Sequence, residues 1–134
     1  MTTEQVTPPS REPIDNVRLA TFTPMAVRAA LQLGLFTPLA QGPMTAEELA
    51  VSLGVKPRRL EALLYQLVVS ESLDVNDGRF SNTDMAAYYL VEGTPNYTGG
   101  IHGIWTEQFN AMMHTADSIR TDTAQTKMDF SGMS

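Results

Sequence analysis

The spacing of apolar residues along the chain predicts helices more than strands. In a first stretch, residues 14–33, apolar side chains cover almost the whole circumference of a helix, and Gly34 follows as a C-terminal cap. A helix that is apolar nearly all round must be covered on more than one side. Pro24 lies inside this stretch. We expect it to kink the helix or split it in two, because proline has no backbone N–H and its ring clashes with the preceding turn.

Residues 45–69 carry the start and stop signals of two consecutive helices. Thr45 and Glu48 form a capping box, and Gly54 ends the first helix. Pro57 suits the first turn of the second. Five apolar residues then recur at helical spacing: Leu60, Leu63, Leu64, Leu67 and Val68. This pattern predicts a helix–turn–helix whose second helix buries one continuous stripe.

A hairpin and further helices are predicted next. Asp77-Gly78 is a tight-turn signal between two short strands. Ser81 is expected to cap a short helix after the hairpin. Beyond the breaker EGTPNYTGG, apolar residues from 101 to 116 recur at helical spacing and predict a last helix of about five turns. The predicted fold class is therefore mainly α: a winged-helix-like helical domain with one small β-hairpin.

The net charge of the chain is unfavourable for binding DNA, the usual ligand of a winged helix. It has 15 acidic and 9 basic residues, a formal net charge of −6. A protein that neutralises about six to ten phosphates needs at least that many well-placed cations. The second helix offers Lys56, Arg58 and Arg59, and the hairpin adds Arg79. A stand-alone winged-helix transcriptional regulator that binds DNA is therefore kept as the alternative, and we expect no nucleic acid as partner.

Composition and the apolar pattern exclude several further classes of protein. No apolar run is long enough to cross a membrane, and residues 1–13 lack the apolar core of a secretory signal. We interpret these residues as a disordered lead-in, expect no membrane partner, and take the cytoplasm as the simplest compartment. The chain has no cysteine, so disulfides and thiolate metal sites are excluded.

The sequence offers little for catalysis. His102 and His114 lie too far apart to share a helix face, and no H-E-x-x-H pair is present, so no metal site is predicted. His102 is interpreted either as a polar position at a helix edge or as a donor in a pocket wall. No nucleophile, base and orienting group occur together in sequence, and we assign no catalytic residue.

An ordered series of short motifs is more specific than any of them alone. The series is LGLF, then GPMTAEELA and LGV, an arginine-led leucine helix, the Asp-Gly hairpin, NYTGG and a helix bearing Trp105. From about residue 14 to 118 the chain resembles the N-terminal region of S-adenosylmethionine-dependent small-molecule O-methyltransferases. These include the caffeate and flavonoid enzymes of plants and bacterial natural-product relatives.

The resemblance implies that residues 14–118 form a dimerisation domain with a degenerate winged helix. Its first helices would interlock with those of a second copy in an intertwined homodimer, and the winged helix would be buried scaffold. Residues 119–134 would be a linker toward a doubly wound catalytic domain, absent from this chain, that binds S-adenosylmethionine. The intact enzyme would methylate a hydroxyl of a small, aromatic acceptor. This chain alone is expected to be inactive and to bind no cofactor.

The resemblance also implies a lid over the acceptor, built by two subunits. Leu19 and Phe22 would come from the opposite subunit's first helix. The helix bearing the tryptophan and the turn before it would contribute five residues: Asn96, His102, Trp105, Phe109 and Met112. Core packing is the competing interpretation for the apolar members. A third possibility is a dimerisation module that binds an aromatic ligand without chemistry.

Overall fold

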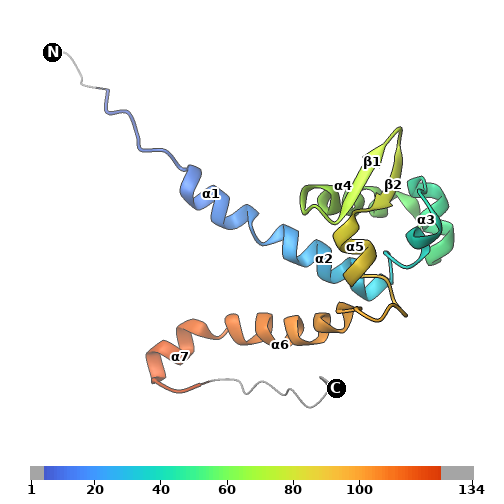
Figure 1. Ribbon diagram of the computed structural model, residues 1–134. Coiled ribbons are helices and arrows are strands. Elements are labelled where there is room, and N and C mark those ends of the chain that lie inside the picture. Colours follow the sequence, from blue (N-terminus) through green and yellow to red (C-terminus); the bar gives the residue numbers. More distant parts are fainter. Residues whose placement is uncertain (1–4, 125–134) are drawn as a thin grey trace.

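The computed structural model describes residues 5–124, and helices predominate in this part of the chain (Figure 1). The elements are α1 (Glu12–Leu19), α2 (Phe22–Leu33), the 3₁₀ helix η1 (Pro38–Gln41), α3 (Ala46–Leu53), α4 (Pro57–Val69), β1 (Leu73–Asn76), β2 (Arg79–Asn82), α5 (Asp84–Tyr89), the 3₁₀ helix η2 (Gly99–Ile101), α6 (His102–Met112) and α7 (Thr115–Thr121). The mainly α class with one hairpin is confirmed. Residues 1–4 of the predicted lead-in and 125–134 of the predicted linker lie outside the described residues.

The first predicted helix is two helices. The chain leaves α1 at Ala20 and enters α2 after Thr21, so the split expected from Pro24 is confirmed. Pro24 is the third residue of α2, where its missing N–H costs nothing because the first N–H groups of a helix have no intrahelical acceptor. Gly34 caps α2 with a left-handed φ of 64° and donates its N–H to the carbonyls of Ala30 and Leu31.

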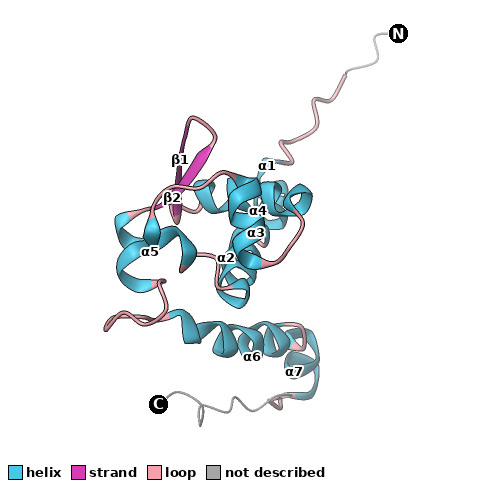
Figure 2. Cartoon of the chain, turned by 90° about the vertical axis from the view of Figure 1, so that its right-hand side faces the viewer, coloured by secondary structure: helices cyan, strands magenta, loops and turns pink. Residues whose placement is uncertain are grey.

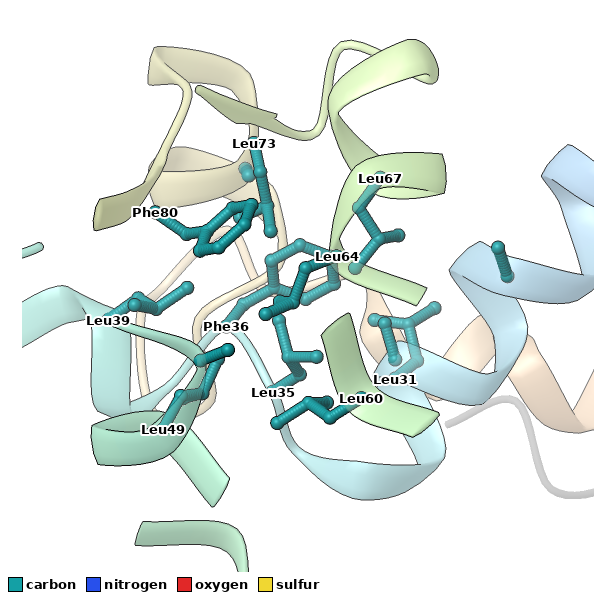
Figure 3. Packing of buried hydrophobic residues seen from close by; sticks show 14 of the residues in the cluster. Leu31, Leu35, Phe36, Leu39, Leu49, Leu60, Leu64, Leu67, Leu73 and Phe80 are labelled. Carbon is teal, nitrogen blue, oxygen red and sulfur yellow. The ribbon is translucent and has the colours of Figure 1, made fainter. Parts of the chain in front are cut away.

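The core lies where α2, α3, α4 and the hairpin meet (Figure 3). Helix α4 contacts α2, α3 and β1, so its stripe is covered by three elements. The stripe is buried at Leu60, Leu64 and Leu67. The largest fully buried side chains come from α3, α4, β1 and the loop after α2: Leu35, Phe36, Leu49, Leu64, Leu67 and Leu73. This single cluster fixes the winged helix on α2.

The hairpin forms as predicted and is anchored to the segment before α3. β1 pairs with β2 across the Asp77-Gly78 turn, in which both residues have positive φ, 52° and 71°, as a two-residue hairpin turn requires. Met44 adds a bridge: its N–H donates to the Phe80 carbonyl at 2.9 Å, and the Phe80 N–H donates back at 2.7 Å. The wing is thus tied to the start of the helix–turn–helix.

The cap predicted for α5 was wrong. Ser81 lies in β2, and Thr83 is the N-cap residue. The Thr83 hydroxyl accepts a hydrogen bond from the Ala86 N–H at 3.3 Å and lies 2.9 Å from the Glu71 carbonyl, to which it donates. Strand pairing decides this difference, because the register Leu73↔Asn82 keeps Ser81 in the ladder.

The corrected cap gives a direct test. We expect Thr83→Ala to lower the free energy of unfolding by about 1 kcal/mol, because it leaves an orphan N–H at the start of α5. Ser81→Ala is the matched control and should change it by less than about 0.5 kcal/mol. Urea unfolding followed by circular dichroism measures both. Equal losses for the two variants would contradict the assignment of the cap.

The single last helix predicted from residues 101–116 is also two helices. Helix α6 ends at Met112, and α7 begins at Thr115. The Thr115 hydroxyl donates to the Met112 carbonyl at 2.7 Å, a local bond of the kind that competes with the helical ladder. Neither helix buries any residue, so no packing holds the two on one axis. Helix α7 continues to Thr121, three residues past the predicted end of the domain.

Two arms extend from the core. Helix α1 projects beyond the core as a continuation of α2, and α6 with α7 run along a different side of α2 (Figures 1 and 2). Helix α1, like α6 and α7, buries no residue. Most of the burial in the described chain therefore lies between α2 and α5, and the arms present their side chains outward.

Candidate functional site

The first arm carries an apolar surface that this chain leaves uncovered. We name it the N-terminal apolar face, and it comprises Ile14, Val17, Leu19, Phe22, Met25 and Leu33, all exposed. On α2, Phe22 and Leu33 lie on the same side as the buried Ala26, at four- and seven-residue spacing, but they occupy the two ends of the helix and are exposed. Met25 is also exposed. Two turns of helix such as α1 are not stable in water without packing. This surface therefore calls for a covering partner.

The second arm adds further apolar surface. Ile101, Met112, Met113 and Ile119 are exposed on α6, α7 and the turns beside them. Exposed apolar side chains that gather on one surface mark sites of association. Among the described helices, α1, α6 and α7 bury no residue, and all three carry exposed apolar side chains.

Two contacts hold the base of α6 against the core. Trp105 packs on the core cluster while remaining half-buried. Arg28 of α2 donates from Nε and Nη2 to the Thr106 hydroxyl oxygen, at 3.0 and 2.6 Å, and from Nη1 to the Gln32 side chain at 3.2 Å. The Thr106 hydroxyl in turn donates to the His102 carbonyl at 3.0 Å. The first half of α6 is thereby fixed beside α2.

The turn into α6 is fixed by close packing. Gly99 is buried, and a Cβ at this position would overlap the ring of Tyr97. Burial raises the pKa of the Tyr97 phenol, and the negative charge of Glu92 raises it further. Tyr97 therefore stays a neutral, packed side chain at physiological pH, which favours a structural role at this turn.

The structure places the seven predicted lid residues on α1, α2, α6 and the turn before α6. His102, Trp105 and Phe109 are half-buried on α6, Met112 is exposed at the end of this helix, and Asn96 is exposed in the turn that precedes η2. Leu19 and Phe22 are exposed on the N-terminal apolar face. Of the apolar members, Trp105 is the one that packs against the core cluster, as the competing interpretation expected for it. The two groups belong to different elements, and a lid built by two subunits stays a prediction.

Sequence reasoning missed Arg28. It is a lone cation in the apolar segment MAVRAALQL, and that isolation was the available signal. Every other described lysine or arginine is exposed, whereas Arg28 is half-buried.

The winged-helix surface is built differently from a DNA-binding face. Helix α4 is buried on one side, at Leu60, Leu64 and Leu67. Its outward side, including Arg58, Arg59 and Tyr65, is exposed in the single chain. The wing's cation, Arg79, lies 3.3 Å from a Glu48 carboxylate oxygen. A phosphate would have to compete with this carboxylate, and DNA binding is accordingly not favoured.

A cofactor or metal site would need particular elements and side chains within the residues that the structure describes. The sheet in residues 5–124 is a two-stranded antiparallel hairpin, whereas a dinucleotide-type cradle needs a strand, a glycine-rich turn and a helix in a parallel sheet. Residues 5–124 therefore contain no cradle of this kind. Within the same range no cluster of three or more metal-ligating side chains occurs, and no helix is long and apolar enough to span a bilayer.

One pocket outside the arms has an acidic rim. It has a volume of about 460 Å³ and lies between the end of α4, β1 and the start of α5. Its lining is formed by Val68, Glu71, Leu73, Asp74, Thr83, Asp84 and Met85. The three carboxylates disfavour anionic ligands there.

Comparison with known proteins gives a family and a set of relatives. Residues 18–92 match the family model described as the O-methyltransferase dimerisation domain, which is more than half of the chain. The chain is 38% identical over 95 residues to the 3-hydroxy-5-methyl-1-naphthoate 3-O-methyltransferase of Streptomyces sahachiroi, covering 70% of this chain and 28% of that protein. It is 39% identical over 75 residues to the N,N-dimethyltransferase OxyT of Streptomyces rimosus, covering 56% of this chain and 22% of that one.

Solved structures share the fold. The methyltransferase CalO1 of calicheamicin biosynthesis, with S-adenosylhomocysteine bound, has a TM-score of 0.73 and 28% identity over 83% of this chain and 34% of its own. PigF with S-adenosylhomocysteine has a TM-score of 0.76 and 25% identity, covering 85% and 38%. The chain spans only about a quarter of the length of the curated relatives reported above.

Proposed function

Because this chain belongs to the family of O-methyltransferase dimerisation domains, we propose that it pairs with a second copy through the N-terminal apolar face. In the same proposal the α6 arm forms part of a lid over the acceptor of an S-adenosylmethionine-dependent methyltransferase. The observation that carries the proposal is the exposure of an apolar arm on a helix, α1, that buries nothing in its own chain.

A second copy of the chain fits this surface better than an unrelated partner. Soluble homo-oligomers are most often symmetric dimers, in which the same patch of both subunits meets. The N-terminal apolar face extends over two consecutive helices and has no acidic residue among its six members. Two such arms crossing each other would cover both at once, which supports the intertwined arrangement.

The proposed acceptor is a small aromatic molecule with a hydroxyl to be methylated. Flat acceptors favour pockets with aromatic and thioether walls and a few polar anchors. Trp105, Phe109 and Met112 on α6 offer such walls, and Leu19 and Phe22 would approach from the other subunit. The relative from Streptomyces sahachiroi acts on a hydroxynaphthoate, as its name states. In the whole protein S-adenosylmethionine would supply the methyl group, bound by residues outside the range that the structure describes.

The decisive experiment is sedimentation of the purified chain over a range of concentrations. We expect the mass of a dimer at micromolar concentration, because a monomer would leave the N-terminal apolar face in water. A mobility-shift assay on mixed genomic DNA at low salt tests the alternative in the same preparation. A monomer that shifts DNA in a strongly salt-dependent way would overturn the proposal in favour of the regulator.

A further inference from the structure

Arg28 is the feature of the described chain that the dimer proposal does not explain. It is half-buried between α2 and α6, and it forms no ion pair with any carboxylate of the described residues. The described arginines that do form ion pairs, Arg11, Arg79 and Arg120, are all exposed. Removing a charge from water without a counter-charge is costly. An anion that joins this site would remove much of that cost.

The guanidinium is held in a fixed orientation by neutral oxygens. Its Nε and Nη2 groups both donate to the Thr106 hydroxyl, and Nη1 donates to Gln32. The Thr106 proton is directed to the His102 carbonyl, so the lone pairs of this hydroxyl are turned toward Arg28. A planar cation that is oriented before a ligand arrives loses less conformational entropy on binding.

Two N–H groups of Arg28 remain available to a ligand. A guanidinium has five N–H donors, and the three hydrogen bonds above leave one N–H on Nη1 and one on Nη2 without a partner among the described residues. A carboxylate has two acceptor oxygens and can accept a hydrogen bond from each of these groups. A phenol or an amide has one acceptor oxygen for these two N–H groups, whereas a carboxylate has two.

The location ties this site to the lid. On α2, Arg28 neighbours Met25 and Gln32 at three- and four-residue spacing, so it lies at the border between the N-terminal apolar face and α6. Through Thr106 it contacts the turn of α6 that holds His102 and Trp105. A ligand bound there would have an aromatic wall and a cation within one helical turn of each other.

We propose that Arg28 binds the carboxylate of an aromatic acid, so that the acceptor class of this lid is acidic aromatics and not neutral ones. This inference rests on the proposed function for the identity of the site. Arg28 then acts as a residue that determines specificity: it anchors the carboxylate, and the ring lies against α6.

The test compares two ligands of one shape on the intact chain. Isothermal titration calorimetry measures the binding of 1-naphthoate and of the neutral 1-naphthamide. We expect the wild type to bind the carboxylate at least about tenfold more tightly, because charge-assisted hydrogen bonds are roughly twice as strong as neutral ones. Arg28→Gln should bring the two affinities within about threefold of each other. Arg28→Lys, which keeps the charge but not the paired N–H groups, should fall between them.

Arg58→Gln is the matched control, since it removes one exposed positive charge from α4. It should leave the preference for naphthoate intact, and circular dichroism checks that each variant is folded. A wild type that does not bind naphthoate at millimolar concentration, or that binds both ligands equally, overturns the proposal.

Sedimentation of the same samples separates this failure from failure of the proposed function. A dimer without naphthoate preference overturns the role of Arg28 alone, whereas a monomer overturns the dimer proposal. If Arg28→Gln weakens the dimer and the wild type shows no ligand preference, the carboxylate belongs to the second copy, which also overturns the assignment to an acceptor.

Discussion

Replacing Phe22 by aspartate is expected to convert the dimer into a monomer. Phe22 is 53% exposed in the isolated chain and belongs to the N-terminal apolar face. In the proposed dimer the new carboxylate would be buried without a partner, at a cost of about 3–5 kcal/mol, which raises the dissociation constant of the dimer more than about 100-fold. Sedimentation equilibrium of the wild type and the variant measures this change.

The substitution is chosen so that it spares the fold of the monomer. Phe22 is the first residue of α2, and an acidic residue in the first turn of a helix interacts favourably with the helix dipole. Val51→Asp is the matched control, because Val51 is 83% exposed on α3, outside both arms. It should remain a dimer. If both variants dissociate, or neither does, the N-terminal apolar face is not the interface.

The second large effect is expected in the core. Leu64 is fully buried on α4, and its side chain points into the core cluster near Leu35 and Phe36 (Figure 3). Leu64→Ala should lower the free energy of unfolding by about 2–5 kcal/mol, through the lost transfer energy and the cavity that remains. That is a large share of the roughly 5–15 kcal/mol that stabilises a typical domain. Urea unfolding at one fixed protein concentration measures the change, because dimerisation is coupled to stability.

Val69→Ala on the same helix is the control for this experiment. Val69 is 70% exposed, and its truncation should change the free energy of unfolding by less than about 0.5 kcal/mol. Comparable losses at Leu64 and Val69 would mean that the outward side of α4 is covered in solution. The winged helix would then have a second partner beyond the proposed dimer.

Elements governed by local chemistry were predicted closely. Thr45 accepts the Glu48 N–H at 3.2 Å, which is one half of the predicted capping box; the Glu48 carboxylate, expected to complete the box, pairs with Arg79. Gly34 and Gly54 adopt the left-handed conformation that ends α2 and α3. The Asp77-Gly78 turn forms as expected. Such signals act within about one turn of the chain, so neighbours in sequence are enough to determine them.

Elements governed by distant contacts were predicted less well. Both Ser81 and Thr83 are residues that cap helices, and only the pairing of β1 with β2 selected Thr83. The break between α6 and α7 occurs in a segment with continuous helical spacing. Of its apolar residues, only Trp105 packs against the core cluster in the described chain, so the helical period alone did not determine a single axis.

In the candidate site, too, some features follow from the sequence and others depend on contacts between distant residues. The sequence by itself determined that the opening helices carry more apolar surface than a small chain can cover, and the resemblance named the residues of the lid. It did not show that Arg28 reaches Thr106, 78 positions further along the chain. Hydrophobic periodicity records which side of a helix is apolar. Which polar groups meet across two helices depends on their relative position, and that is set by how the whole core packs.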